Sequence, residues 1–435
     1  MKKVLAILLA FTLMTTALAG CTSSGDTSSG EPASSAETER TNITVMLESS
    51  ENGEPYKIWS QLYAGYLEEA GLDLEIEWEL LPNDDDYANK LQLYLASNTL
   101  PDHYACANGT FSSAAKEINA IVNVGEELKR AGYYDQMNGA IIDFLTDADD
   151  GEVYLWPGAL YCEYFYYRKD KFEQYNLEAP TTWNEFLNVC QVLTDNGETA
   201  VMIGGASQHQ LMRYVSLPVW RAVGPEFIMD FVNLETTFAE TPIGYKGAEI
   251  VYELGTKGYF QDGFTATDYT DAGDMFFAGE GCIFYAGSDK AAKAAEGYDD
   301  GIYGIFGVPD VDGVENVSTN IPIHAGFANA FNAQTYDSVM QGFFDYICQH
   351  FGDACYDVGL FSPFVGELPE ELPQIYADAY ELFESAEIGW TSWDDKLDAA
   401  TCTAMQDLDE ELALGLITPE DWYTELDKIV VENNS

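Results

Sequence analysis

The feature that most constrains the fold is a regular alternation of short apolar runs and amphipathic segments in residues 43–107. Apolar and β-branched side chains fill the short runs, whereas large side chains recur every third or fourth residue in the segments between them. The predicted strands are 43–47, 74–80 and 103–107, and the predicted helices are 58–70, which Gly71 ends, and 87–95. Helical crossovers join parallel strands, so this order predicts a mainly parallel sheet covered by helices.

A similar alternation begins again in the middle of the chain. An aromatic run at 164–167 predicts a strand, and Thr182 with Glu185 three residues later forms a capping box that starts a helix. A further strand is expected at 199–204, and residues 372–431 are largely helical. We therefore predict an α/β fold with two lobes of comparable size, each a mainly parallel sheet covered by helices, and a helical C-terminus.

The first twenty residues have the pattern of an export signal. Lys2 and Lys3 give a positive start, and residues 4–18 are apolar but contain several threonines, too short and too polar a stretch for a membrane span. The tetrapeptide Leu-Ala-Gly-Cys that ends at Cys21 is similar to the cleavage site of bacterial lipoproteins, whose cysteine becomes the new N-terminus and carries the lipid. We predict a signal peptide at 1–20 and a lipidated Cys21. The alternative is an ordinary signal peptide with an incidental cysteine.

The segment after Cys21 is predicted to be a tether. Residues 21–40 are rich in Ser, Thr, Gly and Glu and contain no large apolar side chain, which is typical of a flexible linker. The folded body is therefore expected outside the cytoplasm, held near the membrane by lipid.

The charge of the chain limits its partners. Among 435 residues, 74 are acidic and 19 basic, a formal net charge of −55. This excludes sequence-independent nucleic-acid binding, which needs Lys and Arg to replace counterions on phosphate, and argues against electrostatic adhesion to anionic lipid. Hydrophobic residues make up 47% of the chain and charged ones 21%, which excludes general disorder.

Sequence patterns for catalysis, cofactors and metals are absent. The motifs HExxH, GxxxxGK[ST], GxGxxG and GxSxG do not occur, and no two of the four histidines have helical ligand spacing. Residues 147–152 and 310–313 are better explained as turns than as calcium loops. Beyond Cys21 the chain has seven cysteines, an odd number without a CxxC pair, which is a poor disulfide framework. We expect no enzyme activity, no cofactor and no metal.

Four groups of segments share motifs with a known family. They are Asp-Tyr-Ala-Asn-Lys-Leu at 86–91 with Leu-Ala-Ser-Asn-Thr-Leu-Pro-Asp at 95–102; Tyr-Leu-Trp-Pro at 154–157 with Tyr-Tyr-Arg-Lys-Asp-Lys-Phe at 166–172; Pro-Thr-Thr-Trp-Asn-Glu-Phe-Leu at 180–187; and 276–284 with Ala-Gly-Ser at 286–288. In order and spacing they resemble the family-1 extracellular solute-binding proteins of ABC importers, the branch that mostly binds sugars. The resemblance extends over essentially the whole mature chain.

The resemblance implies a two-lobed clamp like the type II periplasmic binding proteins. The chain would cross between the lobes near Leu160, His324 and Ser362. The predicted N-terminal lobe is 41–160 with 325–361, and the predicted C-terminal lobe is 161–324 with 362–435. Such a clamp captures a sugar or oligosaccharide between its lobes, closes over it and is recognised by an ABC permease. Gram-positive importers tether their binding protein by lipid, in agreement with Cys21, and we expect a monomer.

Aromatic rings are expected to cover the apolar faces of a sugar, while planar polar groups bind its hydroxyls. The candidate stacking residues are Trp156, Trp390 and Tyr285; Trp156 lies beside a predicted crossing, and Trp390 lies where the family places a stacking Trp. For Trp220, a core position is the better interpretation.

Candidate polar contacts come from loops that the resemblance places at the cleft. They are Asn108, Gln208, His209, Arg213, Ser288, Asp289 and His324. His324 suits a sugar hydroxyl better than a metal, and Arg213 is equally consistent with a structural ion pair. Asp289 stands where the family often has a Trp after Gly-Ser, which argues against a maltodextrin-like stack there. It is either a ligand acceptor or the N-cap of the following helix.

Other functions remain open on the sequence alone. A binding protein of this kind can take a non-sugar solute, such as a peptide or a cation attracted by the acidic field. From other classes, the chain can be a secreted glycan hydrolase, or a surface protein without a small ligand.

Overall fold

The computed structural model describes residues 40–433 except 148, 242, 385, 391 and 395. The predicted signal peptide, Cys21 and the linker as far as residue 39 lie outside the described residues. Within the described part, no helix combines the length and the apolar character needed to cross a membrane.

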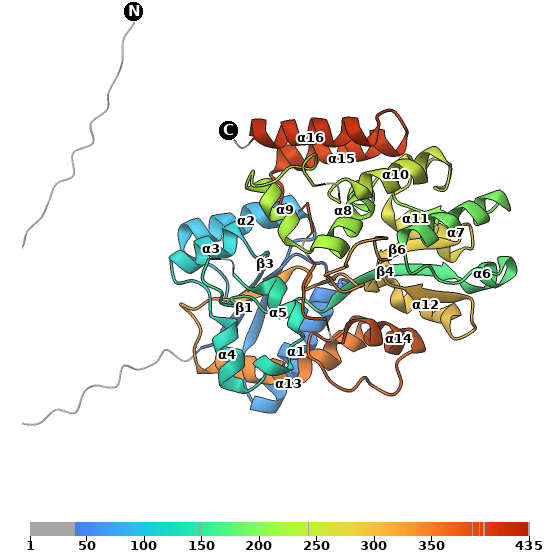
Figure 1. Ribbon diagram of the computed structural model, residues 1–435. Coiled ribbons are helices and arrows are strands. Elements are labelled where there is room, and N and C mark those ends of the chain that lie inside the picture. Colours follow the sequence, from blue (N-terminus) through green and yellow to red (C-terminus); the bar gives the residue numbers. More distant parts are fainter. Residues whose placement is uncertain are drawn as a thin grey trace, which may run out of the picture. The chain divides into compact units, whose positions relative to one another are not determined.

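The first sheet, which defines the first lobe, has the strand order β2-β1-β3-β9. Figure 1 labels two of its strands, β1 and β3. Its strands are β1 (Asn42–Leu47), β2 (Glu75–Leu80), β3 (His103–Cys106) and β9 (Ala328–Phe331). β1 pairs in parallel with β2 along its whole length and in parallel with β3, whereas β9 runs antiparallel to β3. The prediction of a mainly parallel sheet in this lobe is confirmed.

Helices cover the first sheet as the sequence predicts. They are α1 (Glu54–Ala70), α2 (Asp84–Ser97), α3 (Thr110–Glu117), α4 (Val124–Ala131), α5 (Gly139–Leu145) and α13 (Ser338–Asp357), with a 3-10 turn η1 (Tyr134–Gln136). α1 ends at Gly71, whose φ of 64° is the left-handed conformation that glycine tolerates best. α13 returns from late in the chain and packs along α1.

The second sheet, which defines the second lobe, has the order β5-β6-β4-β7, and β8 also pairs with β4. Its strands are β4 (Tyr161–Arg168), β5 (Val201–Met202), β6 (Ile283–Gly287), β7 (Tyr303–Phe306) and β8 (Ile323–His324). β4 is antiparallel to β6, β7 and β8, and only β5 and β6 are parallel. The prediction of a mainly parallel sheet is therefore wrong for this lobe, because the neighbours of β4 arrive from distant parts of the chain rather than through short crossovers.

The second lobe is rich in helices. They are α6 (Lys169–Tyr175), α7 (Trp183–Asp195), α8 (His209–Val223), α9 (Glu226–Val232), α10 (Lys246–Thr256), α11 (Tyr269–Phe277), α12 (Ala291–Tyr298), α14 (Gln374–Phe383), α15 (Ala399–Ala413) and α16 (Pro419–Asn433), with 3-10 turns η2 (Phe264–Ala266) and η3 (Ser288–Lys290). Thr182 caps α7 by accepting a hydrogen bond from the Glu185 amide at 3.3 Å, as predicted. The helical C-terminus is also confirmed.

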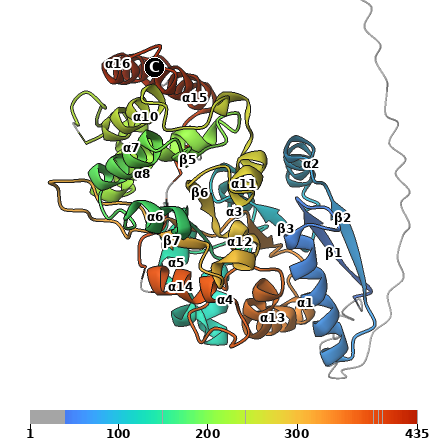
Figure 2. The ribbon, with the colours of Figure 1, turned by 90° about the vertical axis from the view of Figure 1, so that its right-hand side faces the viewer.

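The second sheet separates two hydrophobic cores. Along β4, Tyr164 and Tyr166 point into the core that also fills the first lobe, whereas Phe165 points into a second core beneath α7, α8 and α10. Figure 2 shows β1, β2 and α1 at one side and α7, α8 and α10 at the other. The α/β fold with two lobes is thus confirmed. The lobe boundaries given above stay a prediction.

Candidate functional site

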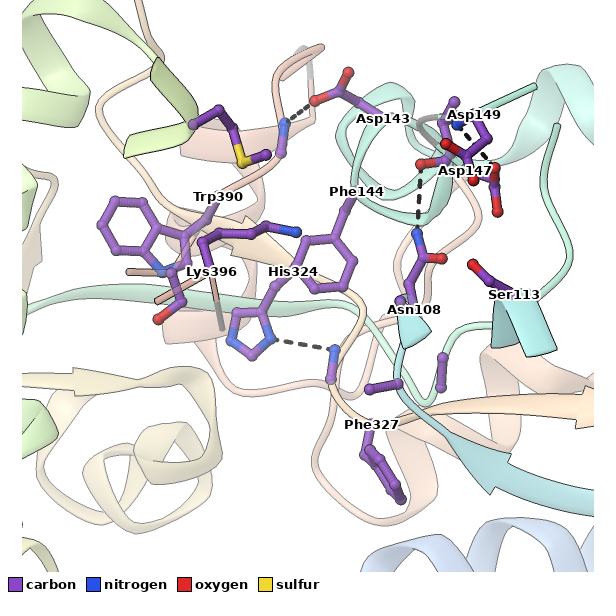
Figure 3. A pocket seen from close by; sticks show the side chains of 18 residues that line it. Asn108, Ser113, Asp143, Phe144, Asp147, Asp149, His324, Phe327, Trp390 and Lys396 are labelled. Atoms are coloured by element: carbon purple, nitrogen blue, oxygen red, sulfur yellow. Dashed lines mark hydrogen bonds between the residues drawn. The ribbon is translucent and has the colours of Figure 1, made fainter. Parts of the chain in front are cut away.

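A cavity of about 610 Å³ lies between the two lobes. Its walls come from the first lobe (Ala107, Asn108, Gly109, Ser113, Asp143, Phe144, Thr146, Asp147, Asp149), from the crossing around β8 and β9 (His324, Gly326, Phe327, Ala328) and from the second lobe (Met229, Gly389, Trp390, Ser392, Lys396). Figure 3 shows Trp390 and Lys396 on one side, facing Phe144 and Asn108 on the other. The volume is typical of a site for a small organic ligand.

The first-lobe wall follows the end of β3, where ligands commonly bind in sheets of this kind. Asn108 donates from its amide to the carbonyl of Thr146 at 3.4 Å. Asp147 lies in a turn, accepts hydrogen bonds from the amides of Asp149 and Asp150, and forms an ion pair with Lys116 at 2.9 Å. The ion pair with Lys116 therefore holds this loop in place. The described residues contain no group of side chains arranged to hold a metal.

Besides the imidazole of His324, the rings of Phe144, Phe327 and Trp390 line the cavity, and they differ in how far they are buried. Trp390 is 1% exposed and packs edge-on against Trp220, with ring centres 5.1 Å apart. Phe327 is 43% exposed, and Phe144 is half-buried. In this conformation the accessible apolar faces are therefore those of the two phenylalanines.

His324 lines the cavity as a neutral ring. Its Nδ1 accepts a hydrogen bond from the Gly326 amide at 3.2 Å, and it stacks on Tyr161 with ring centres 5.4 Å apart. Burial lowers its pKa more strongly than nearby Glu163 raises it. Because Nδ1 accepts, the proton sits on Nε2, which lies 4.0 Å from the Glu163 carboxylate and is available as a donor.

Gly326 permits this arrangement. Its φ of 63° is left-handed, and a Cβ at this position would overlap the ring of Tyr161. The peptide can thus turn back and present its amide to His324.

A charged network lies behind the second-lobe wall. The Arg213 guanidinium donates from Nη1 to Ser392 Oγ at 2.6 Å and to Asp394 Oδ1 at 3.0 Å, and its Nε is 3.4 Å from Glu163 Oε2. Burial raises the pKa of Glu163 and of Asp394, but the charge of Arg213 and the hydrogen bonds from Tyr285 and Ser392 together outweigh it, so both pKa values lie below the ordinary value. Because the Arg213 guanidinium already has Ser392, Asp394 and Glu163 as partners, a structural ion pair is favoured over direct ligand binding by Arg213.

Three of the ten predicted ligand residues line the cavity: Asn108, His324 and Trp390. Trp156 lies fully buried in the first core, between Phe344 and Phe351 at ring distances of 5.3 Å. Its position favours a packing role, because its ring points away from the space between the lobes.

Tyr285, Ser288 and Asp289 do not line the cavity. Tyr285 donates its hydroxyl to Glu163 at 2.7 Å, so it belongs to the charged network. Ser288 Oγ accepts from the Cys162 amide at 3.2 Å. The Asp289 carboxylate accepts from the Tyr269 hydroxyl at 3.2 Å and pairs with Lys290 at 2.8 Å.

The alternative interpretation of Asp289 as a helix cap is not supported. Helix α12 begins at Ala291, its N-cap residue is Lys290, and no side chain caps it. Gln208 and His209 mark the start of α8, as expected, but neither lines the cavity. A ligand role for these residues stays a prediction.

Sequence reasoning missed several wall residues. Phe327 directly follows the predicted crossing at 324–326, and this position could have identified it as a candidate for the cavity wall. Phe144 and Asp143 lie in a short helix without any motif, and Lys396 lies in an irregular segment. Nothing in the local sequence marks these three.

Comparisons with known proteins agree with this architecture. A family model described as bacterial extracellular solute-binding protein matches residues 50–337. A structure from a study of xylan utilisation by Caldanaerobius polysaccharolyticus is 19% identical, covers 89% of this chain and 99% of its own, and has a TM-score of 0.72. A chitin oligosaccharide binding protein is 19% identical, covers 90% and 98%, and has a TM-score of 0.70.

A third structure, the binding protein RafE in complex with raffinose, is 18% identical, covers 90% and 98%, and has a TM-score of 0.67. Identities this low show a common fold. No curated protein sequence matched the chain. Because the family model covers well over half of the sequence, the chain belongs to the bacterial extracellular solute-binding protein family.

Proposed function

We propose that the protein captures a sugar or oligosaccharide in the cavity between its lobes and delivers it to an ABC permease. It does so without catalysis or a cofactor, as a monomer on the outer face of the membrane. The observation that carries the proposal is the cavity itself, which receives side chains from both lobes and from the crossing between them.

The chemistry of the walls suits a carbohydrate. Phe144 and Phe327 offer apolar ring faces, and His324 Nε2 and the Asn108 amide offer hydrogen-bonding groups close to them. Sugars need both kinds of surface, because their C–H faces are apolar and their edges carry hydroxyls. Xylan, chitin oligosaccharide and raffinose are the carbohydrates named for three proteins of the same fold, which supports this ligand class.

A sugar panel tests the proposal directly. The folded protein is titrated by calorimetry and thermal shift with raffinose, galactose, xylo-oligosaccharides and chito-oligosaccharides. A sugar at a hundredfold excess over its Kd stabilises the protein by about 2.7 kcal/mol, which a thermal shift detects. If only spermidine or short basic peptides bind, the ligand is a cationic solute, and release of reducing ends from the oligosaccharides would identify a hydrolase.

A pair of variants locates the binding site. Phe327→Ala removes an exposed ring from the cavity and should weaken sugar binding by roughly tenfold, about 1.4 kcal/mol. Leu93→Ala removes an apolar side chain from α2 that is 69% exposed, against 43% for Phe327, and lies away from the cavity wall, so it should leave affinity unchanged. Equal affinity of the two variants would place the sugar elsewhere.

The membrane anchor is a separate part of the proposal. We place the lipid on Cys21, after cleavage of residues 1–20, on the extracellular face of a Gram-positive membrane. A Cys21→Ala variant should appear in the culture medium or remain unprocessed, while its folded body still binds the sugar. Persistence of the variant in the washed membrane fraction would refute lipidation at this cysteine.

Closure of the lobes is the third part. We assign residues 41–160 with 325–361 to one lobe and 161–324 with 362–435 to the other, which agrees with the strands of each sheet. A bound sugar should draw the lobes together and reduce the radius of gyration in small-angle scattering. An unchanged radius in the presence of saturating sugar would indicate a rigid site.

A further inference from the structure

The irregular segment between α14 and α15 forms most of the second-lobe wall. It contributes Gly389, Trp390, Ser392 and Lys396 to the cavity, although the residues described between 384 and 398 include no helix or strand. Its position must therefore be fixed by contacts with other elements.

The first-lobe helix α5 holds the beginning of this segment. The Ala140 amide donates to the Ala386 carbonyl at 3.2 Å, and the side chain of Asn138, the N-cap of α5, donates to the Phe383 carbonyl at 3.3 Å. The Gly389 amide then donates to the Asp143 carboxylate at 2.9 Å (Figure 3). Asp143 is exposed at the cavity edge, so its carboxylate joins this wall to the opposite one.

The second lobe holds the end of the segment. Arg213 of α8 donates to Ser392 and Asp394, and its guanidinium lies 5.8 Å from the centre of the Trp390 ring. Accordingly, Ala386 packs in the core that fills the first lobe and one face of the second sheet, whereas Trp390 packs in the second core. The chain passes from one core to the other within four residues, and Gly389 lies between them.

Gly389 fits closely against α5. A Cβ at this position would lie 2.8 Å from the Ala140 carbonyl oxygen and 3.0 Å from the Phe144 backbone nitrogen. Such distances are too short for a side chain, so any larger residue must push the segment away from α5. This position therefore requires glycine, and the hydrogen bond from the Gly389 amide to Asp143 attaches the segment to α5.

We infer that Asp143 and Arg213 are positioning residues of the binding site, which clamp the segment 386–394 from opposite lobes and thereby place Trp390 in the cavity wall. This inference rests on the proposed function for its effect on affinity, but the clamp itself is a property of the free protein. Because the segment is attached to both lobes, its position depends on how the lobes are arranged. Ligand affinity should therefore depend on residues that do not touch the ligand.

Hydrogen exchange tests the clamp without any ligand. In Asp143→Ala, the amide of Gly389 loses its acceptor, and exchange in a peptide spanning 386–392 should accelerate by about fivefold or more. Asp143→Asn keeps an oxygen acceptor and should restore slow exchange. Asp268→Ala removes a comparable bond, from an exposed carboxylate to the Asp271 amide, and should leave 386–392 unchanged. Unchanged exchange in Asp143→Ala overturns the inference.

Arg213 is tested through a mild variant, because removal of the buried guanidinium endangers folding. Ser392→Ala deletes one of the two hydrogen bonds from Arg213 to the segment, together with the bond that Ser392 donates to Asp394, and leaves the ion pairs of Arg213 with Glu163 and Asp394 in place. Exchange around Trp390 should accelerate, with the melting temperature nearly unchanged. Unaltered exchange would show that Arg213 does not position this wall.

A double-variant cycle then separates positioning from direct ligand contact. Whichever of raffinose, xylotriose or chitotriose binds the unmodified protein is titrated against Asp143→Ala, Gly389→Ala and the double variant. If Asp143 acts through the segment, each single variant lowers affinity about tenfold and the double variant loses little more. Losses that multiply would show that Asp143 contacts the sugar independently, against the inference. If no sugar binds the unmodified protein, the proposed function fails and hydrogen exchange alone decides on the clamp.

Discussion

A buried carboxyl group on α15 should make the stability of the protein depend on pH. Asp409 is fully buried, and its Oδ1 accepts a hydrogen bond from Trp422 Nε1 at 2.8 Å, while its Oδ2 has no partner among the described residues. Burial raises its pKa well above the ordinary value, and the bond from Trp422 opposes this only in part. The folded protein therefore binds a proton that the unfolded chain releases above about pH 4.

The sign of the effect follows from proton linkage. A carboxyl whose pKa is raised by folding contributes stability at low pH and loses it as pH rises above the unfolded value. The free energy of unfolding should fall by about 1.4 kcal/mol per pH unit for as long as the folded carboxyl stays protonated. Asp409→Asn keeps the acceptor for Trp422 and removes the titration, so its advantage over the unmodified protein should grow by the same slope.

Urea unfolding at pH 4, 5, 6 and 7, followed by circular dichroism, measures this difference. Between pH 4 and 6 the variant should gain up to about 2.4 kcal/mol relative to the unmodified protein, because the carboxyl of the unfolded chain is only half ionised at pH 4. Asp407→Asn is the matched control, because Asp407 is exposed on the same helix and should show no such trend. A difference between Asp409→Asn and the unmodified protein that does not change with pH would mean that the buried carboxyl is ionised, and the reasoning would be refuted.

Three further predictions concern backbone strain, helix packing and acid sensitivity. Leu234 is 44% exposed with a φ of 60°, so Leu234→Gly should raise the free energy of unfolding by about 1 kcal/mol in urea. A Cβ on Gly247 of α10 would overlap a carbonyl oxygen of α8, and Gly247→Ala should destabilise by at least about 1–3 kcal/mol, whereas Gly366→Ala, which meets no neighbour, should be neutral. Because the pKa values of Glu163 and Asp394 are lowered in the folded state, the network they form with Arg213 should stabilise the protein above about pH 4 and be lost on further acidification, with a shallower acid transition in Glu163→Gln.

The first lobe could be predicted well because its signals are local. The glutamates of 75–79 alternate with apolar residues on β2, and Gly71 stops α1 where the pattern ends. β1 is followed through α1 by its neighbour in the sheet, β2, and β3 also pairs with β1, whereas β9 and α13 return from late in the chain.

The second sheet shows where that reasoning fails. β4 pairs with β6, β7 and β8, which all lie more than a hundred residues later in the sequence. The relative direction of two paired strands then depends on the path of the long connection between them. The sequence of residues 164–167 contains no information on that path. Local pattern predicted the strand and left its partners undetermined.

The site was located more reliably than its residues. Trp156 and Phe327 come from neighbouring stretches, and Trp156 pairs through its backbone with Asn329. Trp156 points into the core against α13, whereas Phe327 lies in the cavity wall and is 43% exposed. Both rings are large and apolar, so their chemistry did not distinguish them. The direction in which each side chain points depends on which face of its segment is packed against the core. Tertiary packing determines that face, and the local sequence does not.

Whether the charged groups at the cavity are already paired matters more for the choice of ligand than how many of them there are. Asp147 is already paired with Lys116, and Arg213 with Glu163 and Asp394, so these charges are satisfied within the protein. Asp149 and Lys396 approach the cavity from opposite walls with opposite charge. An ionic ligand would have to compete with these pairs or meet groups of both signs, and each desolvated charge would cost free energy. A neutral polyol needs only the donors and acceptors that remain, such as His324 Nε2, together with the exposed ring of Phe327. Although the chain has a net charge of −55, the strongest charges at this cavity are already paired within the protein, which is compatible with a neutral carbohydrate as the ligand.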